Sequence, residues 1–123
     1  MTDLLEQKCL PYSSNTSPAT DAEIAELLPQ IPDWLLVDED GSKRLRRSYA
    51  FKDFQSAMTF SQAVGDEAEV AGHHPILTTE WGNVTVEWWT HDVGGLHQND
   101  FIMAAKTDAV AKKLAMFFTL HTR

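Results

Sequence analysis

The chain has 123 residues, 43% of them hydrophobic, which is enough for one domain with a continuous core. Its formal net charge of −8 argues against a nucleic-acid-binding surface, and its single cysteine, Cys9, excludes an intrachain disulfide. No stretch approaches the roughly 20 consecutive apolar residues of a membrane span, and the N-terminus lacks a signal-peptide pattern. We therefore expect a cytoplasmic protein that binds neither nucleic acid nor membrane.

The first 19 residues are predicted to be a flexible lead-in to a single domain that spans residues 20–123. Small polar residues and proline dominate residues 10–20, and such a segment buries too little apolar surface to offset the entropy lost on ordering. Thr20 and Glu23 then have the spacing of a capping box, and apolar residues follow at helical period. A first helix is expected to begin there and to end near Pro32.

Two strand pairs and two further helices are expected beyond this point. Apolar or alternating runs at 34–37 and 45–51 flank turn residues and predict a hairpin, and runs at 76–79 and 84–90 predict another. Asp53 can cap a helix that reaches Gly72, and residues 98–118 predict a long final helix. The expected fold class is α+β, a four-stranded antiparallel sheet with three helices packed on one face in the order α-β-β-α-β-β-α.

Four of the five histidines lie between positions 73 and 97. His73 and His74 leave the second helix for a strand and His91 ends the last strand, so they can meet at one rim of the sheet. Adjacent residues of an extended segment point in opposite directions, so His73 and His74 are not expected to face the same atom. Ordinary loop histidines are the plain alternative. A metal site is disfavoured because a His-x-x-x-His pair and thiolates are lacking, and a Gly-x-Ser-x-Gly nucleophile motif is absent.

One spaced pattern points to a known family. Glu69, His73-His74-Pro75, Trp81, His91 and Asp100 together resemble the signature of the pterin-4a-carbinolamine dehydratases. The resemblance runs from about residue 20 to 121. Two positions depart from it, because Gly72 stands where the family often has Asn or Asp, and His97 where it often has Ser or Thr.

The resemblance implies dehydration of 4a-hydroxytetrahydrobiopterin to quinonoid dihydropterin, a step in tetrahydropterin recycling for aromatic amino acid hydroxylation. It implies that His73 and His91 are the catalytic acid–base pair and that His74, also counted as catalytic, mainly holds the pterin. An imidazole, with an ordinary pKa of about 6.5, can give or take a proton at neutral pH. No cofactor and no metal are expected.

The remaining signature residues have more than one possible role. Glu69 could bind substrate or orient an imidazole, and Trp81 could wall the pterin site or fill the core. Asp100 is expected to be structural, as a cap of the final helix, with Pro75 as a further supporting residue.

Rival functions stay open at this stage. Some members of the family act as dimerisation cofactors of a homeodomain transcription factor, so a non-catalytic protein-binding role is the alternative, and the substrate could be another pterin or a related heterocycle. The apolar residues of the final helix, Phe117 and Phe118 among them, predict self-association as a homodimer or homotetramer.

Overall fold

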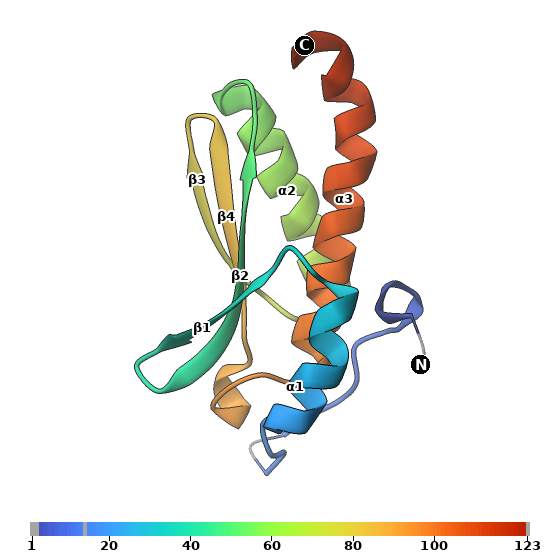
Figure 1. Ribbon diagram of the computed structural model, residues 1–123. Helices are drawn as coiled ribbons and strands as arrows, with labels where there is room; N and C mark the ends of the chain where they lie inside the picture. Colours follow the sequence, from blue (N-terminus) through green and yellow to red (C-terminus); the bar gives the residue numbers. More distant parts are fainter. Residues whose placement is uncertain (1–2, 14, 123) are drawn as a thin grey trace.

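The computed structural model describes residues 3–13 and 15–122, with side chains as far as Ala115. Four strands form one antiparallel sheet in the order β1-β2-β4-β3, and the three α-helices lie on one side of it (Figure 1). The predicted fold class and element order are confirmed. The elements in chain order are η1 (Leu4–Glu6), α1 (Asp21–Leu27), η2 (Leu28–Gln30), β1 (Leu35–Glu39), β2 (Ser42–Ala50), α2 (Phe54–Ala71), β3 (Ile76–Glu80), β4 (Asn83–Trp88), η3 (His91–Val93) and α3 (Gln98–Thr122).

Helix α1 begins at the predicted capping box. The Thr20 hydroxyl accepts from the Glu23 N–H at 3.1 Å, and the Glu23 carboxylate accepts from the Thr20 N–H at 2.8 Å. This reciprocal pair satisfies two amides that a helix start leaves unpaired. The α-helix ends at Leu27, and the 3-10 turn η2 continues to Gln30, so the first helix is shorter than expected.

Each of the two hairpins contributes one central strand of the sheet, β2 from the first and β4 from the second. β2 pairs with β4 over Leu45↔Trp88 to Ala50↔Asn83, and β3 pairs with β4 over Ile76↔Glu87 to Glu80↔Asn83. Alternate residues of each strand point toward the helices, because successive side chains of a strand face opposite sides of the sheet. In this register the first residue of β3, Ile76, pairs with Glu87 near the end of β4. The start of β3 and the end of β4 therefore lie at the same rim of the sheet.

Helix α2 ends at Ala71 and is capped by Gly72, which has the left-handed conformation with φ of +68°. Two amides, of Gly72 and His73, donate to the Ala68 carbonyl and close the last turn. Glycine, asparagine and aspartate are the residues that tolerate this conformation best, so Gly72 meets the same backbone demand as the family's usual Asn or Asp. His73 leaves the helix in a fixed direction.

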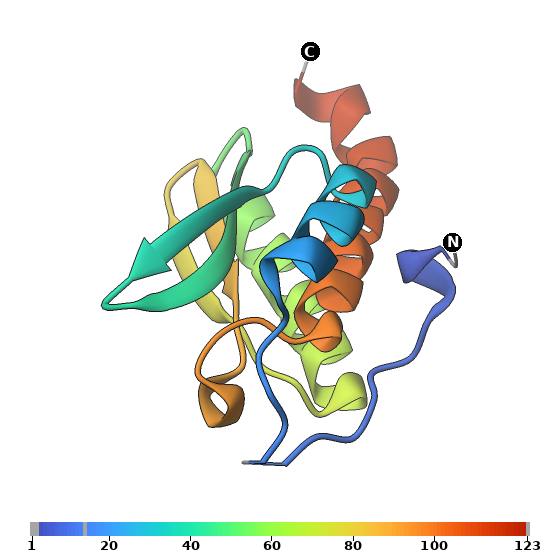
Figure 2. The same ribbon diagram turned by 60° about the horizontal axis from the view of Figure 1, so that its bottom comes forward.

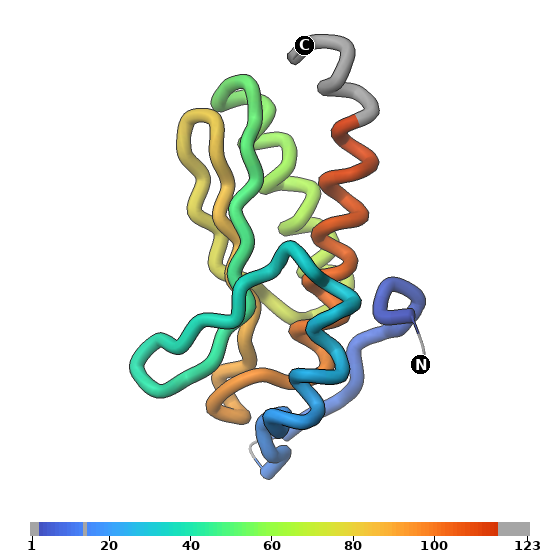
Figure 3. Tube along the Cα trace, viewed as in Figure 1, coloured from blue at the N-terminus to red at the C-terminus, as the bar shows by residue number. Residues whose placement is uncertain are grey.

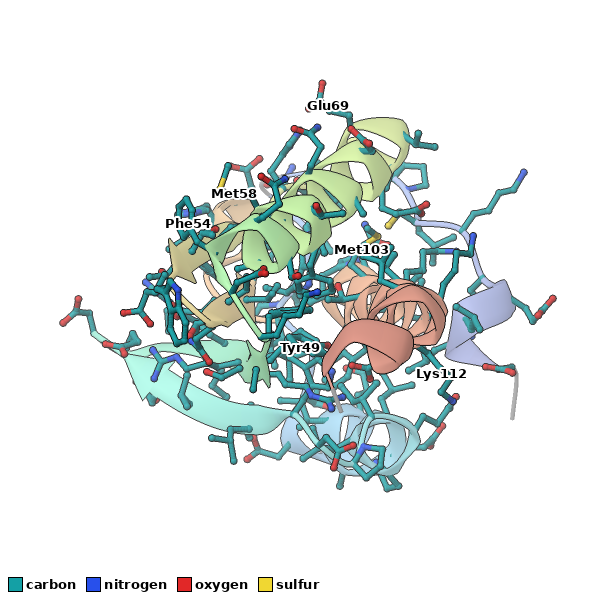
Figure 4. All side chains as sticks on the ribbon, turned by 90° about the horizontal axis from the view of Figure 1, so that it is seen from above. Tyr49, Phe54, Met58, Glu69, Met103 and Lys112 are labelled. Carbon is teal, nitrogen blue, oxygen red and sulfur yellow. The ribbon has the colours of Figure 1, made fainter. Side chains whose placement is uncertain are left out.

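The core lies between the sheet, α2 and α3. Met103 stands between the two helices with Tyr49 on the sheet side, whereas Phe54 and Met58 lie on the outer side of α2 (Figure 4). The core side chains that are at most 1% exposed include Phe60, Val64, Leu45, Val84, Val86, Trp88, Phe101, Ile102 and Met103. Phe101 and Ala104, two apolar residues of the final helix, are thus buried within the chain. The side chains of Phe117 and Phe118 lie outside the described part.

The N-terminal segment runs beside the lower half of α3 (Figure 3). Leu4 is 1% exposed and belongs to the core cluster. The Lys106 ammonium donates to the Leu5 carbonyl at 3.2 Å, and the Ala19 amide donates to the Leu96 carbonyl at 2.7 Å. The flexibility expected of residues 1–19 stays a prediction, now to be weighed against these contacts.

Candidate functional site

The site lies at the sheet rim where α2 ends, β4 ends and α3 begins. His73 and His74 follow the last turn of α2, and Thr90 and His91 follow β4. Because Ile76 pairs with Glu87, both histidine-bearing segments reach the same rim. Asp100, in the first turn of α3, enters from a third element.

Asp100 is fully buried and holds His73 in place. Its Oδ1 lies 2.6 Å from the His73 Nε2, and its Oδ2 accepts from the Thr90 hydroxyl at 2.9 Å and from the His97 N–H at 2.9 Å. Three donors thus surround a carboxylate that has no exposed surface. Asp100 thus binds the His97 N–H at the start of α3 and, through its other oxygen, His73.

The bond to Asp100 favours one tautomer of His73. A carboxylate accepts hydrogen bonds, so the tautomer that fits this contact has its hydrogen on Nε2 and leaves Nδ1 as the accepting nitrogen. The Trp88 indole stacks on the ring at 5.6 Å between centroids and an interplanar angle of 8°. His73 is only 4% exposed. This is an oriented imidazole of the kind that serves in proton transfer.

His74 faces away from His73. Its Nε2 lies 2.6 Å from the Glu69 Oε2, and both side chains are exposed. The expected divergence of the two adjacent histidines is confirmed. Glu69, one turn earlier on α2, therefore pairs with His74. Pro75, which follows His74, leads directly into β3.

His91 lies on the open side of the rim in the 3-10 turn η3. Its ring contacts the Trp89 indole at 4.4 Å between centroids, and the Arg44 guanidinium lies over the same indole at 3.8 Å. Arg44 is held by Glu87 at 3.2 Å. His91 is exposed, so it is open to a ligand from solvent.

Trp81 is the signature residue that does not join this group. It occupies the turn between β3 and β4, at the opposite rim of the sheet from His73 and His91. Its side chain is 73% exposed, so the interpretation as a core residue was wrong. A tryptophan in the short turn between two strands has no helix to pack against. Its residue type alone did not show that it would be exposed.

Three contributors to the site were missed from the sequence. Tyr12, from the lead-in, lies with its ring 6.2 Å from that of His73 and 5.5 Å from that of His97. Thr90 and Trp88 hold Asp100 and His73, as described above. Thr90 directly precedes a signature histidine, which was a usable signal, but no local pattern marks Tyr12.

His97 caps α3 with its ring. The Asn99 N–H donates to the His97 Nδ1 at 3.0 Å, while Asp100 binds the His97 N–H. The two bonds form a capping box in which an imidazole replaces the usual hydroxyl. Burial lowers the pKa of His97, with His73 acting in the same direction and Asp100 against it.

Stability should depend on the protonation of His97. Its pKa is lower in the folded chain than the ordinary value of about 6.5, so the unfolded chain takes up the proton first as pH falls. The stability that the cap provides is present above that value and is lost as pH drops below it. Protonated Nδ1 cannot accept from Asn99. In urea unfolding at pH 7.5 and 5.5, His97→Ser should reduce the stability lost on acidification by up to about 1 kcal/mol. An equal loss in wild type and variant would contradict this, and His91→Ser is the control for removing an exposed histidine.

The rest of the described chain gives little support for other kinds of chemistry. Burial raises the pKa of the Cys9 thiol, with Lys106 opposing and Asp100 reinforcing the shift, which disfavours a nucleophilic thiolate. The described part of the chain gathers no three His, Cys, Asp or Glu side chains that could hold a metal ion. Among residues 3–13 and 15–122, none of the helices combines the length and apolar character that a membrane span requires.

Comparisons with known proteins identify the relatives of this chain. The family model described as pterin 4 alpha carbinolamine dehydratase matches residues 17–110. A protein of Microcystis aeruginosa provisionally named pterin-4-alpha-carbinolamine dehydratase is 58% identical over 92% of this chain and 97% of its own. A provisionally named counterpart from Gloeobacter violaceus is 52% identical over 91% and 97%.

Solved structures extend the likeness. The crystal structure of a transcriptional coactivator/pterin dehydratase from Brucella melitensis has a TM-score of 0.69 and 33% identity over 77% of this chain and 99% of its own. A pterin dehydratase-like RuBisCO assembly factor of the alpha-carboxysome shares the fold, with a TM-score of 0.55 and 20% identity over 64% and 89%.

Proposed function

Because the chain belongs to the pterin-4-alpha-carbinolamine dehydratase family, we propose that it dehydrates 4a-hydroxytetrahydrobiopterin to quinonoid dihydropterin. The observation that carries the proposal is the His73 imidazole, bound through Nε2 to buried Asp100 at the rim that also bears His74 and His91. The product would feed tetrahydropterin recycling for aromatic amino acid hydroxylation.

The reaction needs one proton donor and one proton acceptor. The bond from C4a to the hydroxyl breaks and the hydroxyl leaves as water after protonation, while N5 loses its proton and a C4a=N5 double bond forms. One proton enters and one leaves, so the step consumes no external reagent. Two imidazoles are suited to this exchange at neutral pH.

His73 and His91 are assigned to the acid–base pair, and His74 with Glu69 to binding the pterin. The accepting nitrogen of His73 is Nδ1, which leaves its Nε2 bond to Asp100 intact during proton transfer. His91 is exposed and its ring contacts Trp89, so in this assignment it meets the substrate from the open side of the rim. Trp81, at the far rim of its own chain, is left out of this assignment. We further propose that the protein is cytoplasmic and forms a homo-oligomer. Sedimentation of the purified chain would test the oligomeric state.

The test is the dehydration of freshly generated 4a-hydroxytetrahydrobiopterin, followed by absorbance. His73→Ala and His91→Ala should each lower kcat by about 10²- to 10⁴-fold, since positioned proton transfer contributes that much. His74→Ala should act mainly on KM. Gln55→Ala, on the exposed side of α2, is the control. Absence of acceleration by the wild type over buffer would refute the proposal.

A protein-binding role is the second candidate. It is favoured by the Brucella melitensis relative, which is described as a transcriptional coactivator as well as a pterin dehydratase. The net charge of −8 argues against direct contact with DNA, so such a role would act through another protein. Partner binding that survives in the three histidine variants, beside a wild type inert toward pterin, would favour this candidate.

A further inference from the structure

The N-terminal strap, residues 4–12, lies across the start of α3 next to His73. It is anchored at its beginning by buried Leu4, whose amide donates to the Gln30 side chain at 3.1 Å. Figure 2 shows the segment passing the end of α2 and the start of α3 before the chain reaches α1. The strap therefore borders the candidate site although it precedes the residues matched by the family model.

Asn99 fixes the far end of the strap. Its side-chain oxygen accepts from the Leu10 N–H at 2.7 Å and its side-chain nitrogen donates to the Leu10 carbonyl at 2.8 Å. Asn99 is 1% exposed, so this two-way bond is shielded from water. The next residue, Asp100, holds His73. One helical turn thus sets the positions of both the strap and His73.

Tyr12, two residues beyond this anchor, covers His73. The two rings meet edge to face, with centroids 6.2 Å apart and an interplanar angle of 83°. Trp88 covers a face of the imidazole and Asp100 its Nε2, and Tyr12 is 36% exposed where His73 is 4% exposed. An exposed aromatic ring is thus in contact with a nearly buried imidazole.

A planar ligand does not fit between these rings as they stand. Stacked aromatic layers need about 3.5 to 4.0 Å each, so a heterocycle held between Tyr12 and His73 requires about 7 Å or more between parallel rings. The observed spacing is smaller and the rings are perpendicular. Tyr12 has to move before a flat substrate can contact His73.

We propose that Tyr12 is a substrate-positioning residue that screens His73 in the free protein and stacks on the pterin once the strap has shifted. The inference rests on the proposed function for the identity of the ligand, but the screening of His73 is independent of it. Tyr12 holds no proton in the reaction. Its effect is on access and binding.

The first test measures the reactivity of His73 without substrate. Diethyl pyrocarbonate modification, mapped by peptide mass spectrometry, should be about tenfold faster at His73 in Tyr12→Ala, because one aromatic contact no longer holds the site closed. Tyr12→Phe keeps the ring and should behave as wild type. Exposed His74 and His91 are internal references, and Leu5→Ala is a control on the strap. An unchanged His73 rate in folded Tyr12→Ala overturns the screening role.

The second test uses the reaction. Tyr12→Ala should raise KM by about three- to tenfold with kcat nearly unchanged, the pattern expected when binding alone is lost. Tyr12→Phe should retain the wild-type KM. A ring that only covers His73 would, once removed, leave KM unchanged or lower it, and either result overturns the stacking role. If wild type and variants all fail to dehydrate the substrate while His73 still becomes reactive in Tyr12→Ala, the proposed function fails and the screening role stands.

The third test follows the strap itself. Cys9, the only cysteine, is half-buried on the strap three residues before Tyr12. Saturating 7,8-dihydrobiopterin, a pterin that lacks the 4a hydroxyl, should accelerate modification of Cys9 by a disulfide reagent if the strap shifts on binding. Unaltered Cys9 kinetics with dihydrobiopterin shown to be bound would overturn the shift.

Discussion

Asp100→Asn is expected to lower dehydratase activity by about 10²- to 10⁴-fold while the chain remains folded, because the amide keeps the size of the side chain but not its charge. Asp100 accepts three hydrogen bonds, and an asparagine must turn an NH₂ group toward one of the three donors. If that donor is His73, the imidazole has to reverse its tautomer, which moves the hydrogen to Nδ1. The nitrogen meant to exchange a proton with substrate would then be in the wrong state.

The matched control is Glu69→Gln, which alters the other histidine–carboxylate pair. Glu69 and His74 are separated by the same 2.6 Å, but their side chains are 77% and 61% exposed, so water replaces the lost interaction. The activity of Glu69→Gln should change by less than about tenfold, mostly through KM. The urea midpoint and kcat of both variants would be measured together. A larger loss of kcat in Glu69→Gln than in Asp100→Asn would contradict the assignment of His73 as the oriented imidazole.

The local features of this fold could be predicted, because they depend on neighbouring residues. The Thr20 and Glu23 capping box and the Gly72 helix end are set by short-range geometry, and both were found where expected. The position of His73 and His91 at one rim of the sheet could be predicted, because one precedes a strand and the other ends the strand that pairs with it. These parts required only residue type and spacing.

The contacts that define the site could not be predicted in the same way. His73 and Asp100 are 27 residues apart, and Leu10 and Asn99 are 89 apart, so their pairing depends on how α3 docks. Asp100 was expected to cap a helix, and nothing in its spacing indicates that its other oxygen faces a histidine. Tyr12 lies in a polar, proline-containing stretch that has no periodicity to interpret.

Away from the site, Asp108 joins α3 to the sheet through a polar cluster. Its carboxylate accepts from the Trp34 indole at 3.0 Å, from Arg47 at 2.7 Å and from the Tyr49 hydroxyl. Trp34 and Tyr49 are 4% and 7% exposed. Burial, followed by the bond to Asp108, raises the pKa of Tyr49 above its ordinary range, so the phenol stays a donor at any working pH. Asp108 is the common acceptor of all three groups.

Asp108→Ala should therefore destabilise the fold by about 2 to 3 kcal/mol, since it leaves buried donors without an acceptor. The side chain of Asp108 is 27% exposed, which keeps the loss below that of a fully buried pair because water can reach part of the cluster. Urea unfolding at pH 7 would measure it. Asp21→Asn breaks the exposed ion pair with Lys43, at 2.7 Å, and should cost much less stability, because water replaces the lost interaction. Similar losses in the two variants would mean that Asp108 acts as a surface charge, and the docking of α3 would then depend on apolar packing alone.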